Sequence, residues 1–510
     1  MVMDFIGREG VTVNPYLRLR DKELKTIHSA SMELLTDPGI ELSHEEAADI
    51  FDKAGATVTK SERAKGTWVV KIPEKLVLQA LETAPSQVTL GARNPEHKLI
   101  LDGETPRVYF GSGSETNNIL DTNLEEFTST SDPDKKLKFP VHKRRRGMVA
   151  DLCAAARLGE HLEHLDFFIR PVNIQDDDIS EDSKDVNKFY ACLNNMTKHV
   201  MAGLTDLNQL DNIIRMGEII TGGPEQLKEN PVMSFITCVN KSPLQLEGDS
   251  TEKMLSIIKR DMPVVLSSSP QGGSSAPIDE VGMVAQINAE ILAAVTLSQL
   301  AHPGAKVIYG SVPVRARMDN LHDMYGAPEF NQYNIDCVQM ARYYKLPCYS
   351  TGGVADAKVP GVQATAEKVF SHLYVCMSGP HLLHYAFGLL EETQTFCFEQ
   401  AVLDNQHIGM VKTLMQPPEV SQDNVSYSLD VVRKVMNTSH RLFARYARKR
   451  IHSGQLFLAY PFEGGEIQDE TMANAKAETQ RILAEPVEHL TDATSDQIFA
   501  EIPGILDRIK

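Results

Sequence analysis

The sequence of 510 residues has little of what marks several common protein classes. Its seven cysteines are scattered and form no Cys-x-x-Cys pair, which is typical of reduced thiols and argues against a disulfide framework. Positive charge is not in excess either, since 51 Lys and Arg stand against 69 Asp and Glu, a formal net charge of −18. Binding to nucleic-acid phosphates needs clustered positive charge, so we expect a small molecule or a protein as the partner.

Long apolar runs are absent as well. No stretch approaches the ~20 apolar residues of a membrane span. The first 23 residues carry acidic side chains early and have no apolar core of the length found in signal peptides. We therefore expect no membrane association and a cytoplasmic location.

What the sequence does have is a regular alternation of short apolar segments with longer amphipathic ones, from about residue 105. The apolar segments predict eight strands, at residues 107–111, 166–173, 199–205, 232–240, 263–269, 306–312, 347–352 and 381–388. The amphipathic segments predict helices over residues 149–162, 186–196, 207–220, 250–259, 281–301, 330–344, 363–377 and 398–415. This pattern predicts an α/β fold, a (β/α)8 TIM barrel, and an open doubly wound sheet is the alternative.

Helical patterns flank this region on both sides. Residues 1–95 are interpreted as an N-terminal mainly helical cap, residues 96–419 as the barrel domain and residues 420–510 as a C-terminal helical segment. The last segment includes a basic helical pattern over residues 429–451, and it either packs on the barrel or forms an interface. We expect a homo-oligomer.

Polar side chains lie where the predicted strands end, which is where barrels of this kind place their active sites. Few of these side chains are charged, and Glu115, Asp356 and His384 are the main groups able to move a proton. Such a site is better suited to holding a ligand than to proton transfer, and we assign no catalytic residue. The polar candidates for substrate binding are Arg170, Asn173, Asn240, Gln271, Arg315, Thr351 and His384.

A metal site is not expected. His381 and His384 are three residues apart, and on a strand that spacing points them to opposite faces. No cysteine falls where it would complete a zinc site. The basic run at residues 143–146 is interpreted as the start of a solvated helix, with docking of an acidic protein as the alternative.

Aromatic residues are sparse, at 6% of the chain, so their positions are informative. Several lie within the predicted strands, where they either fill the barrel or together form a cage for a cationic ligand. The aromatic candidates for such a cage are Tyr109, Phe110, Tyr309, Tyr349 and Tyr385.

One corner of the predicted barrel has a distinctive sequence, YSTGGVADAKVPG, at residues 349–361. Gly352 and Gly353 would let the backbone turn close to a ligand. Asp356 and Lys358 are close enough in sequence to pair and hold the loop. We expect residues of this corner to line the substrate pocket, with none required as a proton donor.

Four segments resemble the trimethylamine methyltransferase superfamily: ELKTIHSASMELLTDPGIELSHEEAADIFDKAGATV, VYFGSGSETNNILD, STGGVADAKVPGVQATAEK and LDNQHIGMVK. The resemblance implies a (β/α)8 barrel with helical additions. It also implies transfer of a methyl group from a methylated amine to the Co(I) corrinoid (cobalamin) of a separate small corrinoid protein, with no cofactor bound tightly by this chain.

Members that use trimethylamine contain pyrrolysine, whereas this sequence has only standard residues. It therefore resembles the branch that demethylates quaternary amines such as glycine betaine, proline betaine and carnitine. A quaternary amine leaves as a neutral tertiary amine, so no general acid is needed. Glycine betaine is the first expectation, other quaternary amines are alternatives, and a non-catalytic betaine-binding barrel or a barrel hydrolase or decarboxylase is the competing class.

A betaine also carries a carboxylate that needs a partner. Arg170 is one candidate, and Arg315 or Arg317 is another, because a guanidinium binds carboxylate with two hydrogen bonds. His384 with Asn173, Asn240 or Gln271 could do the same through neutral hydrogen bonds.

Overall fold

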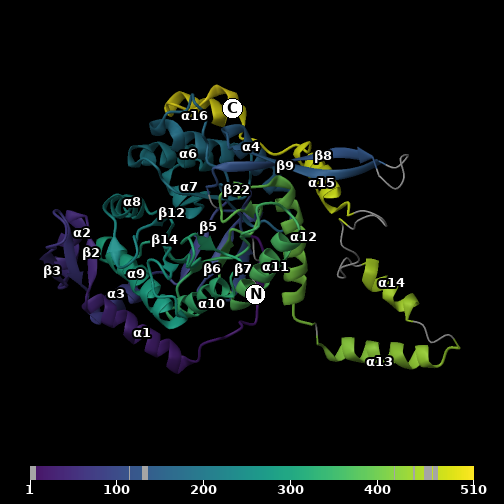
Figure 1. Ribbon diagram of the computed structural model, residues 1–510, viewed down its shortest axis with the longest axis horizontal. Coiled ribbons are helices and arrows are strands. Elements are labelled where there is room, and N and C mark those ends of the chain that lie inside the picture. The colour runs from purple at the N-terminus through teal and green to yellow at the C-terminus, as the bar shows by residue number, and fades with distance from the viewer. Residues whose placement is uncertain are drawn as a thin grey trace.

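A nine-stranded sheet curls through the centre of the molecule (Figure 1). The computed structural model describes residues 7–113, 115–128, 136–418, 420–439, 443–452, 462 and 469–510. Eight strands of the sheet run parallel and match the eight strands predicted from the sequence, while β1 (Val11–Thr12) is antiparallel to the first of them. The eight are β7 (Arg107–Phe110), β10 (Phe167–Ile169), β11 (His199–Ala202), β12 (Met233–Cys238), β14 (Val264–Ser268), β16 (Val307–Ser311), β19 (Cys348–Thr351) and β20 (Leu382–His384).

The first and second parallel strands, β7 and β10, meet at a parallel bridge between Gly111 and Phe167. Side chains extend this seam at both ends. Ser112 Oγ donates to the carbonyl of Ile169 (2.8 Å) and accepts from its amide (3.1 Å). Asp166 accepts from the amide of Phe110 (2.9 Å), so polar side chains continue the pairing where the strands are short.

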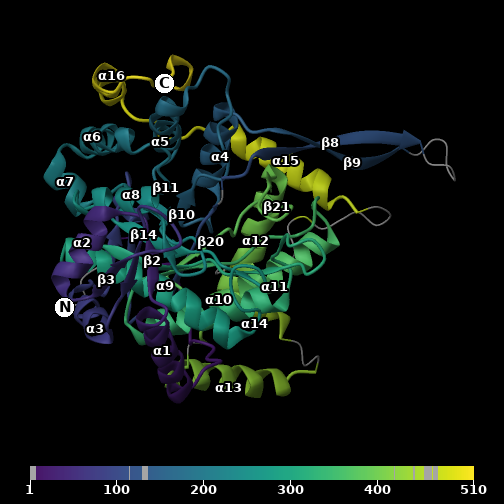
Figure 2. The ribbon, with the colours of Figure 1, turned by 60° about the vertical axis from the view of Figure 1, so that its left-hand side comes forward.

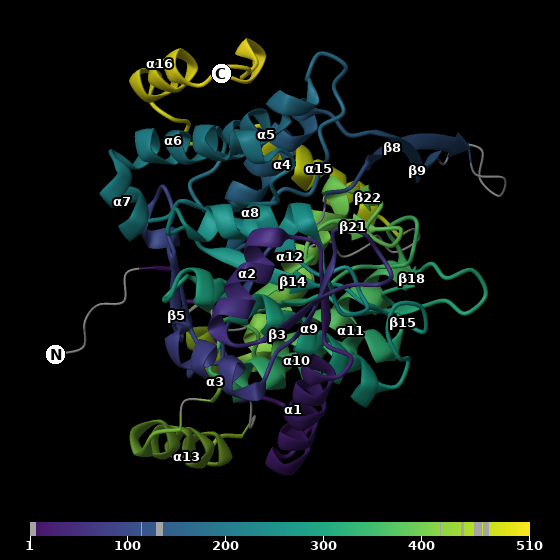
Figure 3. The ribbon, with the colours of Figure 1, turned by 90° about the vertical axis from the view of Figure 1, so that its left-hand side faces the viewer.

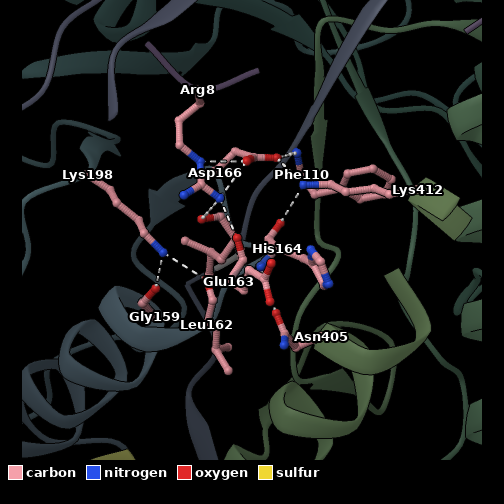
Figure 4. Close-up of polar contacts among 11 residues, drawn as sticks. Arg8, Phe110, Gly159, Leu162, Glu163, His164, Asp166, Lys198, Asn405 and Lys412 are labelled. Carbon is pink, nitrogen blue, oxygen red and sulfur yellow. Dashed lines mark hydrogen bonds and ion pairs between the residues drawn. The ribbon is translucent and has the colours of Figure 1, made fainter. Parts of the chain in front are cut away.

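Asp166, at the amino end of β10, also forms ion pairs with two cationic side chains (Figure 4). Arg8 Nε and Lys412 Nζ each lie 2.9 Å from its carboxylate. Burial would raise the pKa of Asp166, but the two cations outweigh it and hold that pKa below the usual range. Through Arg8 and Lys412, the N-terminal segment and the helix that contains Lys412 are both bound to β10.

Helices cover the outer face of the sheet, as the alternating pattern predicts. Their apolar residues and those of the outward strand positions form the main hydrophobic core. The helices are α4 (Val149–His161), α5 (Lys184–Asn194), α6 (Leu210–Thr221), α7 (Pro224–Glu229), α8 (Gly248–Ile258), α9 (Glu280–Ala301), α10 (Pro328–Tyr343), α11 (Val362–Ser378) and α12 (Phe398–Met415).

A second core fills the inside of the curled sheet. It contains inward-facing residues of the strands, among them Tyr109, Met201 and Leu382. The same cluster includes the apolar residues of a hairpin, β5 (Gln87–Leu90) and β6 (Leu99–Asp102). Because this hairpin contacts residues at the amino ends of β11 and β20, it plugs that end of the sheet.

The N-terminal region packs against α9 through α1 (Asp21–Thr36), α2 (Glu45–Ala54) and α3 (Glu74–Thr83). Between these helices lies a small sheet in the order β13-β2-β4-β3. Its strands are β2 (Ile40–Leu42), β3 (Thr57–Lys60), β4 (Trp68–Lys71) and β13 (Gln245–Leu246). This layer is therefore mixed helix and strand.

A long hairpin, β8 (Asn118–Thr128) and β9 (Lys136–Arg146), projects from the body (Figures 1 and 2). Its base pairs with β22 (Thr395–Phe396), which in turn pairs with β21 (Leu389–Leu390). The prediction that residues 143–146 start a helix was wrong, because they end β9. Three of these basic side chains pair with acids: Arg144 with Glu391, Arg145 with Asp121 and Asp151, and Arg146 with Asp177.

Among its described residues, the C-terminal region contains α13 (Gln422–Met436), α14 (Ala444–His452), α15 (Thr471–Leu483) and α16 (Asp492–Glu501). The helix predicted over residues 429–451 is thus divided between α13 and α14. These two lie apart from the sheet, whereas α15 packs on α12 and α4, and α16 packs on α6 beside the C-terminus (Figure 3).

One helix, α9, is long and apolar enough to span a membrane by length and composition. In the fold, 89% of that apolar window is buried. The same composition is found in central helices of folded domains, and here α9 is covered by the sheet on one side and by α1–α3 on the other.

Candidate functional site

The carboxyl ends of the eight parallel strands form the mouth of the curled sheet. Side chains alternate along each strand, so every second residue faces inward. On β12 the inward residues are Ile236, which is half-buried, and Cys238, which is exposed. Cys238 Sγ lies 3.1 Å from Ser267 Oγ of the next strand. The inner face is therefore open to solvent at this end and plugged at the other.

Three aromatic rings stack on one side of the mouth, from β19, β20 and the residue after it. The rings of Tyr349 and His384 are stacked, with centroids 3.9 Å apart and an angle of 23°. His384 and Tyr385 are also 3.9 Å apart, at 54°. Tyr325 adds an edge contact to Tyr385 at 6.4 Å. We call Tyr349, His384 and Tyr385 the aromatic column.

Tyr385 is the half-buried member of the column, and its backbone is unusual. Its φ is +67°, in the left-handed region that aromatic residues rarely adopt. Strain of this kind costs roughly 1–3 kcal/mol and is concentrated at ligand sites. A Cβ on Gly113 would lie only 2.8 Å from the Tyr385 ring, so glycine there lets the loop after β7 approach the column.

His384 is held as a neutral ring. Its Nδ1 lies 2.8 Å from the carbonyl oxygen of Ser350, so Nδ1 carries the proton and donates it. Burial lowers the pKa of His384 to about 3, since a charged imidazole would lose its hydration. The column thus has no positive charge of its own, and Tyr385 is its one partly exposed ring, which is the chemistry that binds a quaternary ammonium.

A small sheet over the mouth adds two residues that the sequence pattern did not reveal. Its strands are β15 (Gln271–Gly272), β17 (Val314–Ala316) and β18 (Asp323–Met324). Asp323 accepts from Gln271 Nε2 at 2.8 Å and from the Tyr325 hydroxyl at 3.3 Å. Burial raises the pKa of Asp323 above its usual value. Asp323 lies in β18, a strand of two residues, and Tyr325 follows it, so no strand or helix period marks them and only their proximity in the fold identifies them.

Two ion pairs stand at the rim beside β10 and β11. Arg170 pairs with Glu115, and Lys188 pairs with Asp185. Lys188 Nζ also donates to the carbonyl of Gly203, at 2.8 Å. Burial, and then the nearby Arg170, lower the pKa of Lys188 to about 8. Charge is therefore present at the mouth, but in compensated pairs.

The glycine corner turns toward α11 rather than into the mouth. Gly353 has φ of +102°, and a Cβ there would lie 2.2 Å from His372 Nε2. Lys368, which is fully buried, donates to the carbonyl of Gly353 and pairs with Asp404 at 3.1 Å. Of this corner, Thr351 lies on the inner face of β19, while Gly352 and Gly353 serve the packing behind it.

Asp356 does not pair with Lys358. Its carboxylate accepts from the amides of Tyr325 (2.8 Å) and Gly326 (2.9 Å), which fixes the loop that leads into α10. Burial raises the pKa of Asp356 to about 6. The pairing expected from sequence proximity was wrong, because backbone amides of another loop lie closer than the exposed Lys358 side chain.

Several predicted site residues lie elsewhere. Tyr309 and Phe110 occupy outward strand positions, where the Tyr309 hydroxyl donates to Asn288 on α9 and Phe110 lies under Lys412. Tyr109 faces inward but at the plugged end, against Ile100 of β6. Asn240 donates to the carbonyl of Glu290 on α9. Placing the three aromatic residues in a cage at the mouth, and Asn240 against a substrate carboxylate, was wrong, because the pattern of a strand buried on both faces does not reveal which face is inside.

The remaining polar candidates are held at the rim. Asn173 donates to Asn117 Oδ1 at 3.0 Å, and Gln271 is bound to Asp323. Arg315 donates to Met324 Sδ and lies 3.8 Å from Glu329, so it braces the small sheet. The structure brings together Tyr349, Thr351, His384 and Tyr385, with Arg170 across the neighbouring strands. Within the described part of the chain, no group of three or more His, Cys, Asp or Glu side chains is arranged to hold a metal ion.

A curled parallel sheet covered by helices, with aromatic and polar side chains where its strands end, defines an α/β protein. Sequence comparison specifies the family. The chain belongs to the trimethylamine methyltransferase (MTTB) family, whose model matches residues 9–497.

Named relatives span nearly the whole chain. The trimethylamine methyltransferase MttB of Desulfitobacterium hafniense is 29% identical over 96% of this chain and 92% of its own length. MttB of Methanosarcina barkeri is 31% identical over 85% and 82%. A glycine betaine methyltransferase of D. hafniense is 25% identical over 96% of both chains. Among solved structures, a dihydropteroate synthase of Coxiella burnetii covers 65% of this chain and is itself fully covered, at 11% identity and a TM-score of 0.36, too low to bear on function.

Proposed function

We propose that the protein transfers a methyl group from a quaternary amine, with glycine betaine as the first candidate, to the Co(I) corrinoid of a separate small corrinoid protein. The observation that carries this proposal is the neutral aromatic column at the mouth of a chain in the MTTB family. The relatives of this chain include a glycine betaine methyltransferase, and the sequence contains no pyrrolysine.

The chemistry asks little of acids and bases. When the N–CH3 bond breaks, its electron pair stays on nitrogen, and the amine leaves as a neutral tertiary amine without needing a proton. The reduced corrinoid supplies the electron pair that forms the new bond to the methyl carbon. The chain must therefore hold the ammonium, point one methyl group outward and exclude water.

The column fits these tasks. A carboxylate directly against the ammonium would stabilise the ground state more than a transition state in which the charge disperses. Tyr385 instead offers a ring, backed by the buried rings of His384 and Tyr349, and the carboxylates of Glu115 and Asp185 are paired with cations. Tyr385, the half-buried ring, is the one placed to contact the substrate.

The proposal also covers the architecture. We propose that the curled sheet is a closed (β/α)8 barrel, supported by the Gly111–Phe167 bridge and its flanking side-chain hydrogen bonds. The corrinoid protein would then dock over the open mouth, and no tightly bound cofactor is assigned to this chain. A cytoplasmic location and a homo-oligomeric state belong to the same proposal.

The test is to mix the protein with a reduced corrinoid protein and to follow the absorbance change on methylation. Glycine betaine, proline betaine and carnitine are compared as donors. We expect Tyr385→Ala to raise KM for the donor roughly tenfold, the scale of a desolvated cation–π contact. Tyr309→Phe is the matched control, because Tyr309 faces α9, and its KM should not change.

Two outcomes would contradict the proposal. Tight binding of a quaternary amine without any methyl transfer would favour a non-catalytic betaine-binding barrel. Loss of the amine in the absence of any corrinoid would favour a hydrolase or decarboxylase.

A further inference from the structure

Arg170 is a buried cation whose hydrogen-bonding capacity is only partly used. Its side chain is 5% exposed. Nη1 forms an ion pair with Glu115, while Nε is buried and has no hydrogen-bond partner in the part of the chain that the structure describes. A guanidinium has five N–H donors, and leaving a donor unpaired in the interior is costly. The guanidinium therefore depends on one partly exposed carboxylate and has donors left for a second acceptor.

Open space lies in front of the guanidinium. Gly203, just after β11, has no side chain, and a Cβ there would have only two neighbours within 4 Å among the described residues. These are Arg170 Nη2 at 3.6 Å and the carbonyl oxygen of Ile236 at 3.5 Å. Ile236 is the half-buried inward residue of β12, so this space belongs to the mouth.

The charges around this space balance. Arg170 and Lys188 are cations, and Glu115 and Asp185 are anions, so the four sum to zero. Asp185 is fixed by the amides of Thr205 (2.7 Å) and Asp206 (2.8 Å). Glu115 is held only loosely by comparison, as its side chain is 37% exposed at the rim. A carboxylate entering the site would leave one negative charge in excess unless Glu115 moved out to solvent.

The loop after β7 reaches both the aromatic column and Arg170. A Cβ on Gly113 would lie 2.8 Å from the Tyr385 ring and 3.2 Å from the His384 ring, and Glu115, two residues further along the chain, pairs with Arg170. One end of the mouth thus suits an ammonium, and the other suits an anion.

We propose that Arg170 binds the carboxylate of a zwitterionic quaternary amine, and that Glu115 occupies the guanidinium until that carboxylate displaces it. This inference rests on the proposed function and adds the two residues that would select a betaine, in which a carboxylate lies a few bonds from the quaternary nitrogen. Arg170 is then a specificity residue, and Glu115 is its internal competitor.

The test is a calorimetric titration of the full chain, without any corrinoid, with glycine betaine and with choline. Both carry a trimethylammonium group, but choline has a hydroxyl in place of the carboxylate. We expect Arg170→Gln to weaken the binding of glycine betaine at least about tenfold and the binding of choline by less than about twofold. The reason is that a charge-assisted hydrogen-bonded pair is lost with glycine betaine only. Arg170→Lys should give a smaller, still carboxylate-specific loss and guards against misfolding of the first variant.

Replacing Glu115 should change the affinity in the opposite direction. Glu115→Gln should strengthen the binding of glycine betaine about threefold or more and leave the affinity for choline unchanged, because a neutral amide no longer competes for the guanidinium. Arg315→Gln is the matched control, since its guanidinium braces the small sheet, and it should change neither affinity.

The inference would be overturned if Arg170→Gln weakened the binding of glycine betaine and choline equally, or if Glu115→Gln weakened the binding of glycine betaine. The Arg170–Glu115 pair would then be purely structural. The inference would also be overturned if the wild-type protein bound none of glycine betaine, proline betaine and carnitine more tightly than choline. Because the titration needs no methyl acceptor, carboxylate-specific binding without methyl transfer would refute the proposed function and leave this inference standing.

Discussion

At the scale of single residues, burial keeps several histidines of the sheet neutral, including His384 at the mouth. His384 is sandwiched between two tyrosines, and burial lowers its pKa to about 3. His199 and His381, at the plugged end, have pKa values lowered to about 4 by the same cause. A protonated His384 would place a positive charge against the ammonium that the column is proposed to hold.

These shifts make stability depend on pH in a defined direction. In the unfolded chain the same imidazoles titrate near pH 6.5, so the unfolded state takes up protons that the folded state refuses. The free energy of unfolding should therefore fall as the pH drops from about 6.5 toward 4. Urea midpoints at about pH 7 and pH 5 measure this, and nitrogen chemical shifts of His384 should show no titration above about pH 5. A midpoint near pH 6.5 for His384 would contradict the assignment.

The position of a residue could be predicted from the sequence where the end of a strand fixed it, and not where the face of the strand had to be known. His384 and Tyr385 follow from their place at the end of β20. Tyr309 does not, because β16 is buried on both faces and its alternation carries no sign of which side is inside. Pairs such as Arg170 with Glu115 depend on loop geometry and left no trace in spacing.

At the scale of elements, the β7–β10 seam is the weakest joint of the sheet, because side chains replace part of the backbone ladder. Ser112→Ala removes both hydrogen bonds to Ile169 and leaves a buried amide unpaired. We expect a loss of about 1–3 kcal/mol in the free energy of unfolding, measured by urea denaturation. Ser29→Ala, which removes a hydroxyl bonded within the exposed face of α1, is the control and should cost far less. An equal effect of the two changes would show that the seam is closed by other means.

The glycine corner makes a second prediction at this scale. Gly353→Ala combines a left-handed φ with a clash against His372, whereas Gly304→Ala meets a left-handed φ of +84° with open space around it. Gly304→Ala should cost about 1–2 kcal/mol, the price of the conformation alone. Gly353→Ala should cost clearly more, seen as a lower Tm. A smaller effect at Gly353 would mean that α11 can shift away from the corner.

The element order was predictable because apolar runs and helical periodicity agree over most of the chain. All eight parallel strands and the helices after them match the pattern. The β8–β9 hairpin was missed because most of its outer side chains are exposed on both faces, so no apolar alternation marks it as a strand. The small sheet over the mouth was missed because strands of two or three residues are too short to show a period.

At the scale of the whole molecule, α13 presents an apolar stripe to solvent. Val425, Leu429, Val432 and Met436 are 42–51% exposed and are spaced by four, three and four residues, the spacing of a helix–helix seam. A stripe of this kind is complementary to a second copy of itself across a two-fold axis. We expect a homo-oligomer that uses α13 from two chains.

Leu429→Glu combined with Val432→Glu should lower the mass measured by light scattering toward that of a monomer, because two charges would be buried at the seam. Ser426→Glu combined with Lys434→Glu adds acidic groups on other faces of the same helix and is the control. If Leu429→Glu with Val432→Glu leaves the mass measured by light scattering unchanged, α13 is not the interface.

The hairpin β5–β6 fills the inside of the sheet at one end, so among the described residues the inner face is reached from the carboxyl ends of the strands. Under the proposed function, a small amine and a docking protein would both use that end. We then expect the amine to enter first and the demethylated product to leave only after the acceptor protein has departed. Steady-state kinetics should accordingly follow an ordered sequence, with the methyl acceptor as the second substrate to bind and the first product to be released.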